Sequence, residues 1–109
     1  MAEPNLGAVI ERLAATIAAR KGASPDASYT AKLLADGAGK CAKKFGEEAV
    51  ELALAAVSET PERVASEAGD VIYHLLVLLA AREVDVSAVA AALQAREGQS
   101  GHAEKAARK

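Results

Sequence analysis

Apolar residues recur at helical spacing along most of this 109-residue chain, and no stretch alternates polar and apolar residues long enough to argue a strand. Near the N-terminus, the apolar residues that follow this spacing are Leu6, Val9, Ile10, Leu13 and Ile17. The pattern therefore predicts an all-α fold.

Capping and breaking residues divide the chain into five expected helices. Their expected ranges are about 6–21, 29–35, 40–57, 61–82 and 86–98. Side chains that accept backbone hydrogen bonds stand before four of them, at Asn5, Ser28, Thr60 and Asp85. Pro61 follows Thr60 at a first helical position, where its missing N–H does no harm.

The size and composition indicate one domain, residues 1–109, with a small core. Aromatic residues are 3% of the chain and Trp is missing, so Ala, Leu, Val and Ile must form the core. Such side chains bury little area each, and a core of this size is marginal alone. We therefore expect a helical bundle of four to five helices completed by homodimerisation. The polar tail, about 99–109, is expected to be mobile.

Several classes of protein are disfavoured. A net charge of −2 gives no reason to expect nucleic-acid binding. The single cysteine, Cys41, cannot form an intrachain disulfide and is expected in the core. The longest apolar run, 75–81, is too short to span a bilayer, and residues 1–7 lack the basic region of a signal peptide. A cytoplasmic location without membrane attachment follows by default.

Two neighbouring helices carry closely spaced acids. Glu47, Glu48 and Glu51 lie within one turn and are expected on one face of their helix, opposite Phe45, Ala49 and Leu52. Glu67 and Asp70, three residues apart on the next helix, are expected to share a face with Arg63 and His74.

These faces have two interpretations. They can be solvated surfaces, in which Lys43 and Lys44 pair with Glu47 and Glu48, or they can hold a metal. Like charges at this spacing cost about 0.2–0.5 kcal/mol each, and residues 71–81 are apolar nearly all round, which indicates an enclosed helix. Acids beside such a stretch need a cation, and Mg²⁺ is the hard ion that prefers oxygen ligands. A zinc site is disfavoured because the chain has one Cys and two His.

The acidic stretches resemble a known superfamily. Glu47-Glu48-Ala49-Val50-Glu51 and Glu67-Ala68-Gly69-Asp70 are similar to the two-part motif of the all-α nucleotide pyrophosphohydrolases, which include MazG-type enzymes. Four further stretches resemble the phosphoribosyl-ATP pyrophosphohydrolase family within it: SYTAKLL from Ser28, KCAKKFGEEAVE from Lys40, YHLLVLL from Tyr73 and SGHAEKA from Ser100.

This resemblance implies hydrolysis of phosphoribosyl-ATP to phosphoribosyl-AMP and pyrophosphate, the second step of histidine biosynthesis, with Mg²⁺ or Mn²⁺. It implies these metal ligands: Glu48, Glu51, Glu67 and Asp70. Glu47 is expected as an extra ligand or as the base that orients the water. Lys40, Lys43 and Lys44 are expected to contact phosphates. Two alternatives stay open, a general MazG-like nucleoside triphosphate pyrophosphatase and a non-enzymatic helical module.

Overall fold

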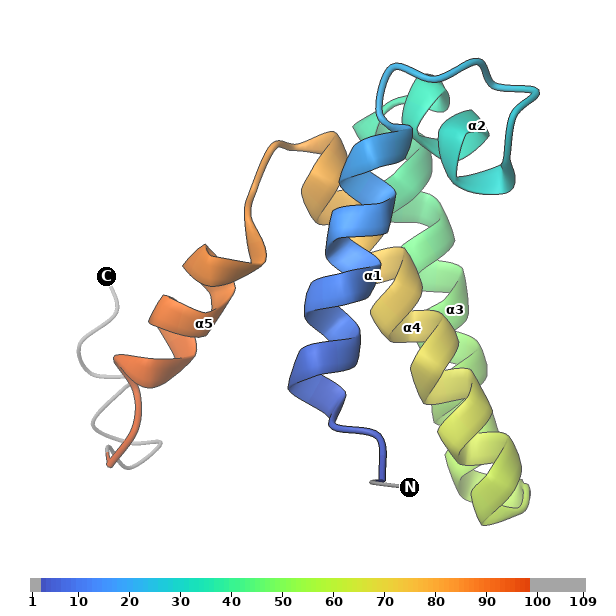
Figure 1. Ribbon diagram of the computed structural model, residues 1–109. Coiled ribbons are helices and arrows are strands. Elements are labelled where there is room, and N and C mark those ends of the chain that lie inside the picture. The colour runs from blue at the N-terminus through green and yellow to red at the C-terminus, as the bar shows by residue number, and fades with distance from the viewer. Residues whose placement is uncertain (1–2, 99–109) are drawn as a thin grey trace.

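The structure is a computed structural model that describes residues 3–98, and over these residues it contains five helices and no strand (Figure 1). The helices are α1 (Leu6–Arg20), α2 (Tyr29–Asp36), α3 (Ala38–Ser58), α4 (Pro61–Ala81) and α5 (Val86–Gln94). The predicted all-α class is confirmed. The predicted mobility of the tail concerns residues outside the described range.

All four predicted N-caps are confirmed. In each, a side-chain oxygen accepts a hydrogen bond from a backbone N–H in the first helical turn, which is otherwise without an intrahelical partner. The pairs are Asn5 with Ala8 (3.0 Å), Ser28 with Ala31 (3.0 Å), Thr60 with Arg63 (3.2 Å) and Asp85 with Ser87 (2.8 Å). Local sequence thus determines where these helices begin.

Two helix ends differ from the prediction. Helix α3 begins at Ala38, two residues early, because Gly37 adopts a φ of 95° that other residues rarely reach and accepts the first helical hydrogen bond, from the Cys41 N–H (3.1 Å). Helix α5 ends at Gln94 rather than near Gly98. No residue of α5 is buried, so no packing supports a longer helix.

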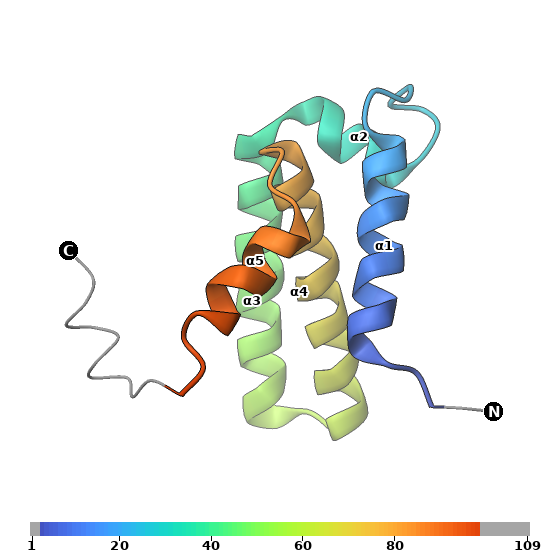
Figure 2. The ribbon, with the colours of Figure 1, turned by 60° about the vertical axis from the view of Figure 1, so that its left-hand side comes forward.

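Helices α3 and α4 form an antiparallel hairpin, joined through Glu59 and Thr60, and lie side by side in both views (Figures 1 and 2). Helix α1 packs against α4, and α2 closes one end of the bundle by contacting α1, α3 and α4. The buried apolar cluster between them contains Ile17, Leu33, Cys41, Leu76 and Val77. The Cys41 thiol donates to the Leu33 carbonyl (3.2 Å), so this cysteine is a core residue as predicted.

Helix α4 is the core helix. Over its whole length, Pro61–Ala81, it is long and apolar enough to cross a membrane, although the apolar run 75–81 alone is not. Here it contacts α1, α2 and α3 and carries Leu76 and Val77 into the core. Its apolar character therefore reflects its central position in the bundle.

Several apolar side chains remain on the surface. Val50, Leu54 and Val57, which we call the α3 stripe, follow one another at i, i+4 and i+7 and are 59%, 65% and 85% exposed. Ala53 and Ala56, which share the helical spacing of Ala49 and Leu52, are exposed too, whereas Ala55 is buried. Helix α5 projects away from the other four helices (Figure 1).

Candidate functional site

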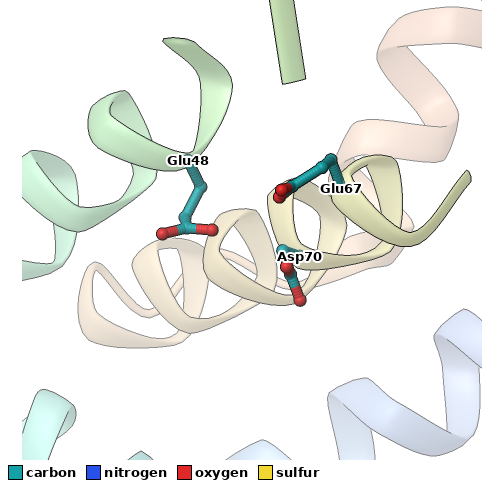
Figure 3. Close-up of side chains that lie close together, drawn as sticks. All are labelled: Glu48, Glu67 and Asp70. Carbon is teal, nitrogen blue, oxygen red and sulfur yellow. The ribbon is translucent and has the colours of Figure 1, made fainter. Parts of the chain in front are cut away.

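Three carboxylates meet between α3 and α4. Glu48 of α3 and Glu67 and Asp70 of α4 each offer an oxygen, and these oxygens all lie within 4.8 Å of one another. Glu48 and Glu67 extend toward one another from the two helices, with Asp70 one turn from Glu67 (Figure 3). We call these three residues the acidic cluster.

The faces of the two helices differ from the sequence-based expectation. Glu67 is buried (7% exposed) and Glu48 is half-buried, whereas Asp70 is exposed. The side of α4 that carries Glu67 and His74 therefore points into the bundle, whereas the sequence pattern only grouped these residues with Arg63 and Asp70. On α3, Glu48 is the glutamate that joins the two α4 acids, whereas Glu47 and Glu51 are exposed.

The cluster concentrates negative charge beside the core of the bundle, with one of its carboxylates, Glu67, buried. Burial raises the pKa of Glu48, and the carboxylates of Glu51 and Asp70 raise it further, while His74 lowers it. Burial and the neighbouring carboxylates both penalise the ionised form of Glu48. A bound cation would offset this penalty, so cation binding here would be favoured.

Two basic side chains contact this region of α4. Arg63 donates to Glu67 over one helical turn (2.7 Å), so a guanidinium balances the buried carboxylate. The His74 Nδ1 donates to the backbone carbonyl of Asp70 (2.9 Å). A carbonyl only accepts, which places a proton on Nδ1; in the neutral ring, Nε2 then accepts from the Tyr29 hydroxyl (3.4 Å). His74 therefore connects Tyr29 of α2 to the part of α4 that carries Asp70.

The other two predicted glutamates lie outside the three-carboxylate cluster. Glu51 is exposed one turn beyond Glu48 and close enough to raise its pKa. Glu47 is exposed and forms an ion pair with Lys44 (3.4 Å). The structure thus brings together Glu48, Glu67 and Asp70, with Glu51 at their edge and Glu47 outside.

A basic groove of about 530 Å³, which we call the lysine groove, lies between α2 and α3. It is lined by Tyr29, Lys32, Leu33, Asp36, Lys40 and Lys44. Two of the predicted phosphate-binding lysines, Lys40 and Lys44, therefore line one groove, and the exposed Lys43 does not. Lys32 and Tyr29 were not predicted as site residues. Their only sequence signal was their place in the SYTAKLL stretch.

A larger groove of about 550 Å³ lies elsewhere, between α1, the end of α4 and the start of α5. Its lining is largely alanine and leucine, with charged groups at Glu11, Lys21, Glu83 and Asp85. None of the acidic cluster lines it. This groove is therefore separate from the acids that could hold a metal.

The acidic cluster suits a hard divalent cation. All of its ligand atoms are carboxylate oxygens, which Mg²⁺ and Mn²⁺ prefer. The soft ligand among the described residues, Cys41, is occupied in the core by the Leu33 carbonyl. The donor set therefore fits a magnesium-type ion, and it leaves coordination positions open for phosphate oxygens.

Comparison with known proteins shows that this chain is similar to one family. The family model described as phosphoribosyl-ATP pyrophosphohydrolase matches residues 10–97. The chain is 66% identical to the phosphoribosyl-ATP pyrophosphatase of Cereibacter sphaeroides, over 92% of this chain and 97% of that protein. It is 62% identical to the proteins of the same name from Dinoroseobacter shibae and Caulobacter sp., over 92% of this chain and 98% and 92% of theirs.

Proposed function

This chain belongs to the phosphoribosyl-ATP pyrophosphohydrolase family, and from that premise we propose how its residues carry out the reaction. The activity is that of a phosphoribosyl-ATP pyrophosphatase, a soluble enzyme of histidine biosynthesis. Water cleaves a phosphoanhydride bond of phosphoribosyl-ATP, and the products are phosphoribosyl-AMP and pyrophosphate. The observation that carries the proposal is the approach of Glu48, Glu67 and Asp70 to within 4.8 Å from two helices.

We propose that these three carboxylates hold Mg²⁺ and that Glu51, one turn from Glu48, either joins them as a fourth ligand or orients the attacking water. When bound, the ion would neutralise charge on the phosphates and lower the pKa of a coordinated water. The chain's own contribution is rigidity, because α3 and α4 pack along each other and His74 fixes the Asp70 backbone (2.9 Å). Arg63 balances Glu67 before the ion arrives and can then turn toward substrate oxygens, since its side chain is 54% exposed.

The proton of the attacking water needs an acceptor. Glu51 is an exposed carboxylate that interacts with Glu48, and Glu47 is one turn from Glu51. We propose that one of these two orients the water. Glu47 was the candidate from sequence, and its ion pair with Lys44 (3.4 Å) favours Glu51 for this role.

We infer that the enzyme is a homodimer in the cytoplasm. Its buried apolar core comprises few residues: Ile17, Ala31, Leu33, Cys41, Ala55, Leu76 and Val77. So small a core is marginal for a chain of this length. The exposed α3 stripe and the α5 helix, none of whose residues is fully buried, supply apolar surface that a second copy would cover.

A substrate panel tests the function. Purified protein is assayed for pyrophosphate release from phosphoribosyl-ATP, ATP and dUTP, each with Mg²⁺ or with excess chelator. The expected result is metal-dependent release from phosphoribosyl-ATP at a kcat/KM well above that of the other two. Equal rates on all three would indicate a general nucleotide pyrophosphatase. If none of the three nucleotides releases pyrophosphate, the chain is a non-catalytic module.

A further inference from the structure

We propose that the lysine groove binds the phosphate of the substrate's phosphoribosyl group, so that Lys32 and Lys40 make the enzyme discriminate phosphoribosyl-ATP from ordinary nucleoside triphosphates. This inference rests on the proposed function, because it assigns the second anionic end of the same substrate. Phosphoribosyl-ATP carries phosphates in two places, the triphosphate chain and the phosphorylated ribose attached to the adenine. A site for it needs two separated regions that accept anions.

The lysine groove lies along the same seam as the acidic cluster. On α3, Lys44 precedes Glu48 by four residues, a rise of about 6 Å. On α4, His74 follows Asp70 by four residues, and the two helices are antiparallel, so both steps lead in the same direction. Tyr29, which lines the groove, contacts His74 there (3.4 Å). The groove therefore begins about one helical turn beyond the acids.

The charge of the groove is opposite to that of the cluster. Three lysines line it against one carboxylate, Asp36. Lys32 pairs with Asp36 (3.4 Å) and Lys44 with Glu47 (3.4 Å). For Lys40, no carboxylate among residues 3–98 lies within ion-pair distance. Lys40, which has no carboxylate partner among residues 3–98, and Lys32, which has one at 3.4 Å, line the same groove. Two ammonium groups in one groove suit a phosphate dianion.

The two regions therefore suit different ends of the substrate. The acidic cluster repels phosphate unless a divalent cation lies between them, which suits the reacting triphosphate. The lysine groove attracts phosphate directly. Its Lys40 lies too far along α3 to reach the acids itself, because it precedes Glu48 by two turns, about 12 Å. An ordinary triphosphate would occupy the first region and leave the second empty.

Steady-state kinetics of Lys32→Gln and Lys40→Gln test the assignment. The kcat/KM for phosphoribosyl-ATP should fall by about 10- to 100-fold, the usual effect of losing a charge-assisted hydrogen bond. The kcat/KM for ATP as a substrate, or its inhibition constant as a competitive inhibitor, should change less than about threefold. Arg12→Gln removes a positive charge from the exposed surface of α1, outside the groove, and should affect neither.

Equal losses on both nucleotides would overturn the proposal and assign these lysines to the triphosphate. No loss on either would overturn it as well. These outcomes can be told apart from failure of the proposed function itself. In that case, the unmodified enzyme would release no pyrophosphate from phosphoribosyl-ATP.

Calorimetric binding of products gives a second readout that does not depend on turnover. Phosphoribosyl-AMP keeps the ribosyl phosphate, and AMP lacks it. The parent should bind phosphoribosyl-AMP at least about tenfold more tightly than AMP, and the double variant Lys32→Gln/Lys40→Gln should bind the two alike. Circular dichroism of the variant checks its folding. Equal binding of both products by the parent would contradict the proposal.

Discussion

Arg63 donates to the buried carboxylate of Glu67 at 2.7 Å, across one turn of α4. A guanidinium thus stands beside a group proposed to hold Mg²⁺. Arginine and metal compete for the same negative charge, and the metal-free enzyme depends on the arginine to neutralise it.

Replacement of Arg63 should make the protein more dependent on metal. In Arg63→Gln, the buried Glu67 carboxylate loses its partner, at a cost of about 1–3 kcal/mol. The metal-free Tm should fall by roughly 5 °C or more, and Mg²⁺ should raise it by more than in the parent. Thermal melts with and without Mg²⁺ measure both effects, with Arg12→Gln as the exposed control. Equal Mg²⁺ shifts in parent and variant would show that Arg63 does not compete with the ion.

Asp70→Asn should separate catalysis from folding. Asp70 is exposed, so the amide fits, while the loss of one charge relieves repulsion within the acidic cluster. Turnover should fall by more than about 100-fold, and the metal-free Tm should stay the same or rise slightly. Saturating Mg²⁺ stabilises a protein that binds it, by about 2.7 kcal/mol at 100 times Kd, and this gain should shrink in the variant. Near-normal pyrophosphate release by Asp70→Asn would remove the basis of the metal site.

The raised pKa of Glu48 predicts how metal-free stability depends on pH. A carboxyl that holds its proton more tightly when folded contributes stability that is fully present below its ordinary pKa of 4.5 and lost as the pH rises through the folded value. The parent should therefore lose stability relative to Glu48→Gln as the pH increases from about 4.5. Urea unfolding of both proteins across pH 4–8 in chelator measures the difference. A difference that grows as the pH falls would contradict the burial of Glu48.

Glu51 and Glu47 can be separated by matched substitutions to glutamine. Glu51 lies beside Glu48, so Glu51→Gln should lower kcat by about 10²-fold or more, the usual contribution of a general base. Glu47 is exposed and paired with Lys44, so Glu47→Gln should cost less than about tenfold. Pyrophosphate release at saturating Mg²⁺ and substrate compares them. The reverse order of losses would support the sequence-based assignment of Glu47.

Features set by local sequence were predictable. The caps at Asn5, Ser28, Thr60 and Asp85 depend on hydrogen bonds to residues two or three positions away, which spacing alone reveals. The grouping of Glu67 with Arg63 and of Asp70 with His74 follows from the helical repeat in the same way. The start of α3 was missed because it depends on the φ of Gly37, and Gly39 is an equally plausible breaker from sequence.

Features set by tertiary packing were not predictable. Periodicity groups Glu67 with His74 but does not say that this face points inward, because that depends on how α1, α2 and α3 surround α4. Lys32 and Tyr29 enter the lysine groove only because α2 folds back against α3, and no spacing in the sequence relates them to Lys40. Ala53 and Ala56 have the spacing of core residues but remain exposed in one chain.

A single charged substitution in the α3 stripe tests whether the protein forms a dimer through this surface. Leu54 is at the centre of the stripe, 65% exposed, with Val50 and Val57 one turn away on either side. If a second copy covers it, Leu54→Arg buries an unpaired guanidinium in the interface and should shift sedimentation from dimer to monomer at micromolar concentration. Within one chain, the same arginine would remain in water, so helicity measured by circular dichroism should change little.

The matched control for this prediction is Ala42→Arg, which adds the same side chain at an exposed position of α3 outside the stripe and should leave the dimer intact. A parent that sediments as a monomer would refute the dimer itself. A dimer that survives Leu54→Arg would place the interface elsewhere, with the apolar surface of α5 as the remaining candidate. The acidic cluster is complete within one chain, so a soluble Leu54→Arg monomer should still bind Mg²⁺. Loss of the Mg²⁺-induced rise in Tm in that monomer would show that dimerisation holds α3 and α4 in their binding geometry.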